Sequence, residues 1–515
     1  MPARTWILAA LLACLLAGSP CAGQPERWVP ALWEGGPLAV HLREKAGAAP
    51  ADSEKAALAG WYSAETLELL EGAAVNCLLM PLSAGAAPEV EKAQHKLVQD
   101  YARLAHSKGQ AVLGLVYAGA DPETAASAAV EAQLDGLVIV GLAQDDTQLL
   151  MKLREALSRR GGKPFAVRVA PAASARLDKE SPLLVVEGTA PRVVQMGDTA
   201  EATPTAGLWL DSNLWLVRSF HAARAGRPVW VWHEPHAEDS AGSLRSVADA
   251  AAAGGRWIVS LNGSLQSGLY RKEPQALALW KQTNDFLRFF EMHAEWRQFS
   301  PYGNVGIVLD SAGPNVAQSE EYLNLIARRQ IPYRVIERSL LNARSLEGLR
   351  AVLAFDLTPP AEAERSLLLE FARKGGLLLG GPSWGKPPAN QSYQVAAAGE
   401  GEIAVYKVDA PDPQGVARDL NDLLTTPELG LSVFDAPSVL AYAAAAAAGK
   451  PVVVHLVNYA SRPADKITLW ISERFESARL LRPEGPPLEL PIKRGADRTE
   501  VVVPNLAVYG ALWLE

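Results

Sequence analysis

The sequence predicts an α/β chain of three domains: a (β/α)8 barrel of the TIM type, a small doubly wound α/β domain and a C-terminal antiparallel β-sandwich. Three observations predict this order. The 515 residues are too many for one core, since domains hold about 100–200 residues. Apolar runs alternate with helical segments over much of the chain, and near the C-terminus the strands follow one another without helices.

Residues 1–23 have the pattern of a signal peptide. Arg4 supplies the positive start, Trp6 to Leu16 form a short apolar run, and small residues precede a cleavage point before Gln24. The run is too short to cross a bilayer, and no other stretch reaches about 18–20 apolar residues. We therefore expect export to the periplasm or the extracellular space, and no membrane span.

Residues 24–298 predict the barrel. They hold eight nearly continuous apolar runs, which are typical of strands buried on both faces, with helical segments between them. The alternation favours a closed barrel, and an open doubly wound sheet is the alternative. The runs are Pro37–Leu42, Val75–Met80, Ala111–Tyr117, Leu134–Val140, Pro164–Val169, Leu183–Glu187, Val229–Trp232 and Trp257–Leu261.

A long helix, about Glu273 to Arg297, is expected to lead out of the barrel into two further domains. Residues 299–425 resume the βα pattern and predict a small doubly wound domain. Residues 426–515 hold strand candidates separated by turn residues, which predict an antiparallel sandwich.

Composition excludes several classes of function. The net charge of −8 comes without a basic cluster, so a nucleic-acid partner is not expected. Once the signal peptide is removed, Cys77 is the only cysteine, which leaves no intramolecular disulfide and no cysteine metal site. No His, Asp or Glu spacing indicates a metal, and no glycine-rich phosphate motif precedes a helix. We expect no cofactor.

Short segments of the last two domains resemble the family-42 β-galactosidases and their relatives. They are Val305–Asp310 and Phe371–Gly381 in the second domain, and Ala436–Leu440 and Val454–Tyr459 in the third. The resemblance covers nearly the whole mature chain in architecture, but only these segments in residues. It implies a glycoside hydrolase barrel, a glutamine-amidotransferase-like domain that these proteins often use for trimerisation, and a small β-sandwich.

The second domain departs from true amidotransferases, which place a catalytic cysteine at a turn after one of its strands. The turn after Leu379 reads Gly380-Gly381-Pro382-Ser383-Trp384, with no cysteine and no histidine nearby. We expect this domain to be structural.

The resemblance implies two catalytic glutamates, after the fourth and the seventh barrel strands. Retaining glycosidases need two carboxyl groups about 5–5.5 Å apart. Glu234, after Val229–Trp232, lies where the nucleophile of the family lies. The fourth strand ends without the Asn-Glu pair of the family, so Glu187, at the end of the sixth run, is the candidate partner. The alternative for both glutamates is an ordinary charge at a strand end.

Other polar and aromatic groups at strand ends are candidates for substrate binding, because barrel enzymes react at the carboxyl ends of their strands. Tryptophan also offers a flat face for a sugar ring. The candidates are Trp230, Trp232, His233, Asn262, His41 and Tyr117.

Two hypotheses for the function follow. The first is an exported glycoside hydrolase acting on an oligo- or polysaccharide, retaining if Glu234 is paired with a nearby carboxyl group. The second is a non-catalytic carbohydrate-binding or scaffold protein that kept the architecture, supported by the missing Asn-Glu pair and by the rule that fold does not imply function.

Overall fold

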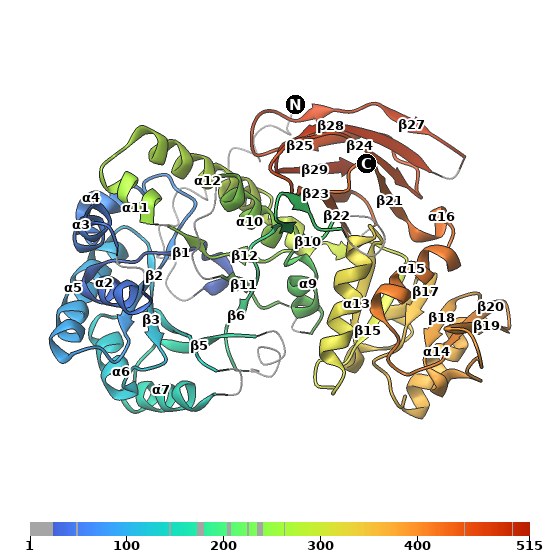
Figure 1. The fold of residues 1–515 in the computed structure, drawn as a ribbon, viewed down its shortest axis with the longest axis horizontal. Helices are drawn as coiled ribbons and strands as arrows, with labels where there is room; N and C mark the ends of the chain where they lie inside the picture. Colours follow the sequence, from blue (N-terminus) through green and yellow to red (C-terminus); the bar gives the residue numbers. More distant parts are fainter. Residues whose placement is uncertain are drawn as a thin grey trace, which may run out of the picture. The chain divides into compact units, whose positions relative to one another are not determined.

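The computed structural model describes residues 24–515, except 48–49, 144–145, 172–179, 203–207, 224–225, 234–239, 262, 448 and 497. The chain forms two compact units (Figure 1). The first comprises the residues up to 168 together with 263–276, and the second comprises 169–262 together with 277–515. The boundary therefore falls inside the predicted barrel, within its fifth strand.

The barrel strands form a nine-stranded sheet of order β12-β11-β6-β5-β4-β3-β2-β1-β13. The first and last strands in this order, β12 and β13, are consecutive in the chain and are separated only by Ile258. Together they correspond to the single strand predicted at Trp257–Leu261. This arrangement confirms the barrel class rather than an open sheet. The strands are β1 (Pro30–Leu32), β2 (Cys77–Ser83), β3 (Ala111–Tyr117), β4 (Gly136–Val140), β5 (Phe165–Ala170), β6 (Leu184–Glu187), β11 (Val229–Trp232), β12 (Arg256–Trp257) and β13 (Val259–Ser260).

The prediction for the first strand is wrong. Pro37–Leu42 lies in helix α2 (Gly36–Lys45), and the first strand is the earlier, three-residue β1. Gly36 has φ +80°, which turns the chain, and Pro37 stands in the first helical turn, where its missing N–H costs nothing. A three-residue strand is too short to show a periodic pattern.

Helices follow the strands in both units. Asp121 caps α6 as its position before Pro122 predicts, since its Oδ2 accepts a hydrogen bond from Thr124 N at 2.8 Å. The helices are α2, α3 (Asp52–Gly60), α4 (Ala64–Glu68), α5 (Pro88–Ser107), α6 (Pro122–Glu131), α7 (Gln148–Arg159), α9 (Leu214–Ala223), α10 (Ser240–Ala252), α11 (Gly263–Tyr270) and α12 (Pro274–Met292), which the 3-10 helix η2 (Ala294–Gln298) follows.

The α/β domain has a sheet of order β16-β15-β17-β18-β20-β19, in which all neighbours except β19 and β20 are parallel. Helices α13 and α15 pack into one hydrophobic cluster and α14 into another, which confirms the doubly wound class. The elements are β15 (Val305–Leu309), α13 (Val316–Arg328), β16 (Tyr333–Glu337), β17 (Ala351–Leu353), α14 (Glu362–Arg373), β18 (Leu377–Gly380), β19 (Tyr393–Ala398), β20 (Gly401–Tyr406) and α15 (Pro413–Leu423).

The C-terminal region is the predicted antiparallel sandwich, with sheets of order β14-β22-β23-β29-β25-β26 and β21-β24-β28-β27. Val454 and Leu512 from the first sheet share one core with Leu469 and Val503 from the second. The longer strands are β22 (Val439–Ala445), β23 (Val452–Asn458), β24 (Ala464–Ile471), β28 (Thr499–Leu506) and β29 (Tyr509–Leu514).

Candidate functional site

The ends of β6 and β11 bring two of the predicted site residues together. The strands are parallel neighbours in the second unit, and Glu187 stands opposite Trp232 in their register. Neighbouring strands lie about 4.7–4.9 Å apart, so these two residues share one face at the carboxyl edge of the sheet. Glu187 is exposed, whereas the three residues before it are buried. Among the described residues, Glu187 forms no ion pair.

The aromatic candidates beside Glu187 differ in accessibility. Trp230 is 0% exposed and Trp232 is 9% exposed, so a sugar would reach Trp230 only after the residues that cover it move. His233 is half-buried, with Nδ1 3.2 Å from the carbonyl oxygen of Gly188 and its ring 6.1 Å from that of Trp257. His233 therefore connects the ends of β6 and β11 with β12.

Two predicted site residues, Glu234 and Asn262, lie outside the described residues, and their roles stay predictions. In the sequence, Glu234 follows Trp232 by two positions.

His41 and Tyr117 belong to the first unit. His41 is half-buried on helix α2, so its expected place after a first strand is wrong. Tyr117 is the last residue of β3 and is half-buried, as its strand-end position predicts.

The sequence analysis missed Glu34, which follows β1 by two residues. Its carboxylate pairs with Arg43 Nη2 at 2.9 Å, and its carbonyl oxygen accepts a hydrogen bond from Gln266 Nε2 at 2.6 Å. Tyr62 donates its hydroxyl to the carbonyl oxygen of Trp33 at 3.1 Å, and burial, then neighbouring Tyr101 and Glu34, raise the pKa of Tyr62 well above its usual value. The signal was the Trp33-Glu34 pair directly after Pro30–Leu32.

A second missed carboxylate, Glu91 of α5, binds the end of β2. It accepts hydrogen bonds from Ser83 Oγ at 2.7 Å, Ala84 N at 2.8 Å and Ala86 N at 3.0 Å, and it lies 3.4 Å from His95 Nε2. Burial alone would raise the pKa of Glu91, but these hydrogen bonds lower it to about 2. Glu91 is charged and internally satisfied, so its role is to hold the strand end.

A buried polar network supports the segment that follows Glu187. Asp249 of α10 is 0% exposed and accepts hydrogen bonds from Ser212 Oγ at 2.8 Å, from Asn213 N at 2.8 Å and from the Tyr459 hydroxyl. Asn213 in turn accepts from Thr189 N at 2.9 Å and donates to Thr189 O at 2.8 Å. The network thus fixes the main chain two residues beyond Glu187.

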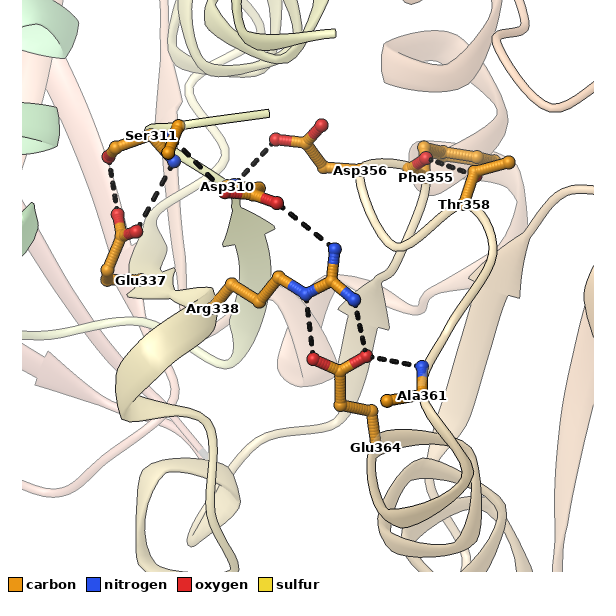
Figure 2. A network of polar contacts seen from close by, with 10 residues as sticks. Asp310, Ser311, Glu337, Arg338, Phe355, Asp356, Thr358, Ala361 and Glu364 are labelled. Atoms are coloured by element: carbon orange, nitrogen blue, oxygen red, sulfur yellow. Dashed lines mark hydrogen bonds and ion pairs between the residues drawn. The ribbon is translucent and has the colours of Figure 1, made fainter. Parts of the chain in front are cut away.

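The α/β domain has its own polar cluster at the carboxyl edge of its sheet, and Figure 2 shows the contacts among its members. Arg338 pairs with Asp310 at 3.0 Å and with Glu364 at 2.7 Å. Glu337 accepts a hydrogen bond from Ser311 Oγ, and Asp356 accepts one from Asp310 N at 2.6 Å. Arg338 therefore connects the ends of β15 and β16 with α14, and the structural role of the domain stays a prediction.

Neither a metal site nor a membrane span is found in the part of the chain that the structure describes. No group of three or more His, Cys, Asp or Glu residues there could hold a metal ion. No helix there is long and apolar enough to cross a bilayer.

Solved structures share this fold. An α-L-fucosidase isoenzyme 2 from Paenibacillus thiaminolyticus matches 88% of this chain and 96% of its own, with a TM-score of 0.57 and 12% identity. The chain has a glycoside hydrolase-like fold. A rhamnosidase from Novosphingobium sp. PP1Y (TM-score 0.46, 11% identity, 83% of this chain and 48% of its own) also matches. So does a family-42 β-galactosidase from G. stearothermophilus (TM-score 0.34, 10% identity, 84% and 70%).

We compare the fold with the fucosidase alone, because the other two TM-scores lie below 0.5. At 12% identity, the likeness concerns the fold and not the activity. No protein-family model matches this chain. No curated protein matches it either.

Proposed function

We propose that the chain is an exported glycoside hydrolase that acts on an oligo- or polysaccharide by a retaining mechanism. The observation that carries the proposal is Glu187, an exposed carboxylate at the carboxyl end of a barrel strand, in register with Trp232. Glu234 follows two residues after Trp232 in the sequence, and a retaining mechanism needs its carboxyl group about 5–5.5 Å from that of Glu187.

In this mechanism, Glu234 is the nucleophile and Glu187 is the acid/base. The Glu234 carboxylate attacks the anomeric carbon and forms an ester, while Glu187 gives its proton to the departing glycosidic oxygen. Glu187 then takes a proton from a water molecule, whose oxygen displaces the ester and releases the sugar with its original configuration. Trp232 and His233, beside Glu187, would contact the sugar ring.

The alternative is a non-catalytic carbohydrate-binding protein. One observation favours it: β4 ends at Val140 and turns at Gly141, where φ is +72°, without the Asn-Glu pair of the resembling family. A binding protein would keep affinity for a glycan but turn none over.

The test is hydrolysis of aryl glycosides and polysaccharides by the mature protein and three variants. We expect Glu234→Gln to lose about 10³-fold or more in kcat on every substrate. Glu187→Gln should lose most on poor leaving groups and least on activated aryl groups, which need no proton. Glu155→Gln, whose side chain is 71% exposed on α7, is the control and should leave the rate unchanged.

The results of these assays distinguish the hydrolase from the binding protein. Activity that survives both site variants would place the reaction elsewhere in the barrel. No turnover of any substrate, together with glycan binding measured by calorimetry, would support the binding protein.

Export and assembly complete the proposal. An N-terminal sequence that begins at Gln24 in secreted or periplasmic material would support export, and retention of residues 1–23 would contradict it. Light scattering of the purified protein tests the trimer that the family resemblance implies.

A further inference from the structure

The second unit contains a cavity of about 190 Å³ that none of the described site residues Glu187, Trp232 and His233 lines. Its walls come from α9, from the end of α10, from α12 with η2, and from strands β22 and β23 of the sandwich. The engineered cavity that takes up benzene has a volume of about 150 Å³, so this one holds a single six-membered ring with one substituent.

The cavity is basic. None of the described side chains that line it is acidic, whereas Arg218 and Arg297 both face it. Arg297 pairs with the carboxylate of Glu291, which also lies 3.2 Å from Arg256. The described lining of the cavity is therefore positively charged, in a chain whose net charge is −8.

Arg218 is the group best placed to meet an anion. It is 8% exposed, and no carboxylate pairs with it among the described residues. Its guanidinium lies 3.9 Å from the ring centre of Tyr333 and 4.6 Å from that of Tyr442, which hold it in place from their faces. Its Nη2 donates to the carbonyl oxygen of Tyr333, and its buried Nε has no acceptor among the residues that the structure describes. Arg218 lines the cavity, and no described carboxylate offsets its charge, so an anion in the cavity would do so.

The remaining walls are flat and largely aromatic. His293 stacks on Trp296 with ring centres 4.1 Å apart and planes 4° apart, and Phe290 and Tyr442 also line the space. Burial, followed by the neighbouring His293, lowers the pKa of His455 to about 3. His455 is therefore neutral near pH 7, and the positive charge of the cavity comes from its arginines. Aromatic walls around a guanidinium suit a ring that carries a carboxylate.

We propose that this cavity binds a small single-ring carboxylate, with the carboxylate on Arg218 and the ring against the aromatic walls. Glu187 does not line this cavity, and the proposal does not depend on glycosidase activity. Two sources share this chemistry: a flat aromatic acid, represented by benzoate, and a uronic acid, represented by glucuronate.

The experiment is isothermal titration of the full mature protein with benzoate, glucuronate, benzyl alcohol and inorganic phosphate at millimolar concentrations. We expect one of the two carboxylates to bind at one site per chain. Benzyl alcohol and phosphate should bind at least about tenfold more weakly, because benzyl alcohol lacks the carboxylate and phosphate lacks the ring. Whichever carboxylate binds identifies the source.

Variants test the location. Arg218→Gln should weaken binding by about tenfold or more. Because that change affects a buried residue, Ala222→Leu provides a second test: it keeps the charge, narrows the cavity and should abolish binding. Arg373→Gln, at an arginine that is 59% exposed on α14, is the control and should bind like the wild type.

The proposal is overturned if neither carboxylate binds, since the cavity would then hold only water. It is also overturned if phosphate or benzyl alcohol binds as tightly as the carboxylates, or if the folded Ala222→Leu protein binds unchanged. Circular dichroism spectra and melting curves of each variant identify any loss caused by unfolding.

Discussion

Two glutamates near the carboxyl ends of barrel strands, Glu91 on helix α5 and Glu187 on β6, have opposite surroundings. Glu91 binds the end of β2 and accepts hydrogen bonds from one hydroxyl and two main-chain N–H groups, with His95 beside it. Glu187 ends β6 exposed, with no ion pair among the described residues. Position at a strand end therefore does not define a reacting group: a carboxylate that the fold already satisfies is structural, and an open one is available to a ligand.

The α/β domain extends the comparison. Its strand-end acids resemble Glu91 rather than Glu187, because Arg338 and the neighbouring donors occupy them (Figure 2). Loss of a satisfied carboxylate or of its partner should cost stability, whereas loss of the open one should cost activity.

The largest effect is expected at Glu91. Glu91→Ala leaves Ala84 N, Ala86 N and Ser83 Oγ without their acceptor and should lower the free energy of unfolding by about 3 kcal/mol at pH 7. Urea denaturation followed by tryptophan fluorescence measures it. A loss no larger than that of Glu187→Ala would remove the distinction between the two residues.

The same glutamate predicts a pH dependence. The pKa of Glu91 is about 2 in the folded protein against an ordinary value of 4.5, so its contribution is complete above about pH 4.5 and is lost as the pH falls toward 2. The shift is equivalent to about 3 kcal/mol. We expect the stability difference between wild type and Glu91→Gln to shrink over that range. A difference independent of pH would show that the charge of Glu91 is not what matters.

A smaller effect is expected in the α/β domain. Arg338→Gln leaves Asp310 and Glu364 facing each other without their shared cation, and we expect a loss of about 2 kcal/mol, since the three side chains are only partly buried. Burial raises the pKa of Glu364, but the hydrogen bonds from Arg338 and Ala361 N outweigh burial, and the pKa lies below its ordinary value. In the variant, Glu364 should therefore take up its proton at a higher pH than in the wild type. Arg373→Gln serves as the exposed control, and equal stability of the two variants would contradict the network's role.

The smallest effect on stability is expected at Glu187. Glu187→Gln should change the free energy of unfolding by no more than about 0.5 kcal/mol, because the side chain is exposed and without an ion pair among the described residues. Denaturation alongside the kinetic assay separates the two properties. A loss above about 1 kcal/mol would make Glu187 structural.

Much of the fold was predictable because local patterns carry it. Ala111–Tyr117 is the predicted strand to the residue, since an unbroken apolar run between turns leaves little choice. Pro30–Leu32 was not predictable, because three residues show no period, and the longer run after it begins with a proline suited to a first helical turn.

The site was less accessible to sequence reasoning. The strand-end place of Glu187 follows from its run, but the burial of Trp230 depends on which elements cover the strand. Likewise, the partners of Glu91 and Asp249 come from other elements of the fold, and no spacing in the sequence encodes them.

The hydrogen bond between Tyr459 and Asp249 has a consequence for folding during synthesis. The two residues are 210 positions apart, and the tyrosine is near the end of the chain. At about 5–20 residues per second, a ribosome needs roughly 10–40 s to add the tyrosine after the aspartate. During that interval Ser212 and Asn213 can already bind Asp249, but the network stays incomplete until the tyrosine has been added.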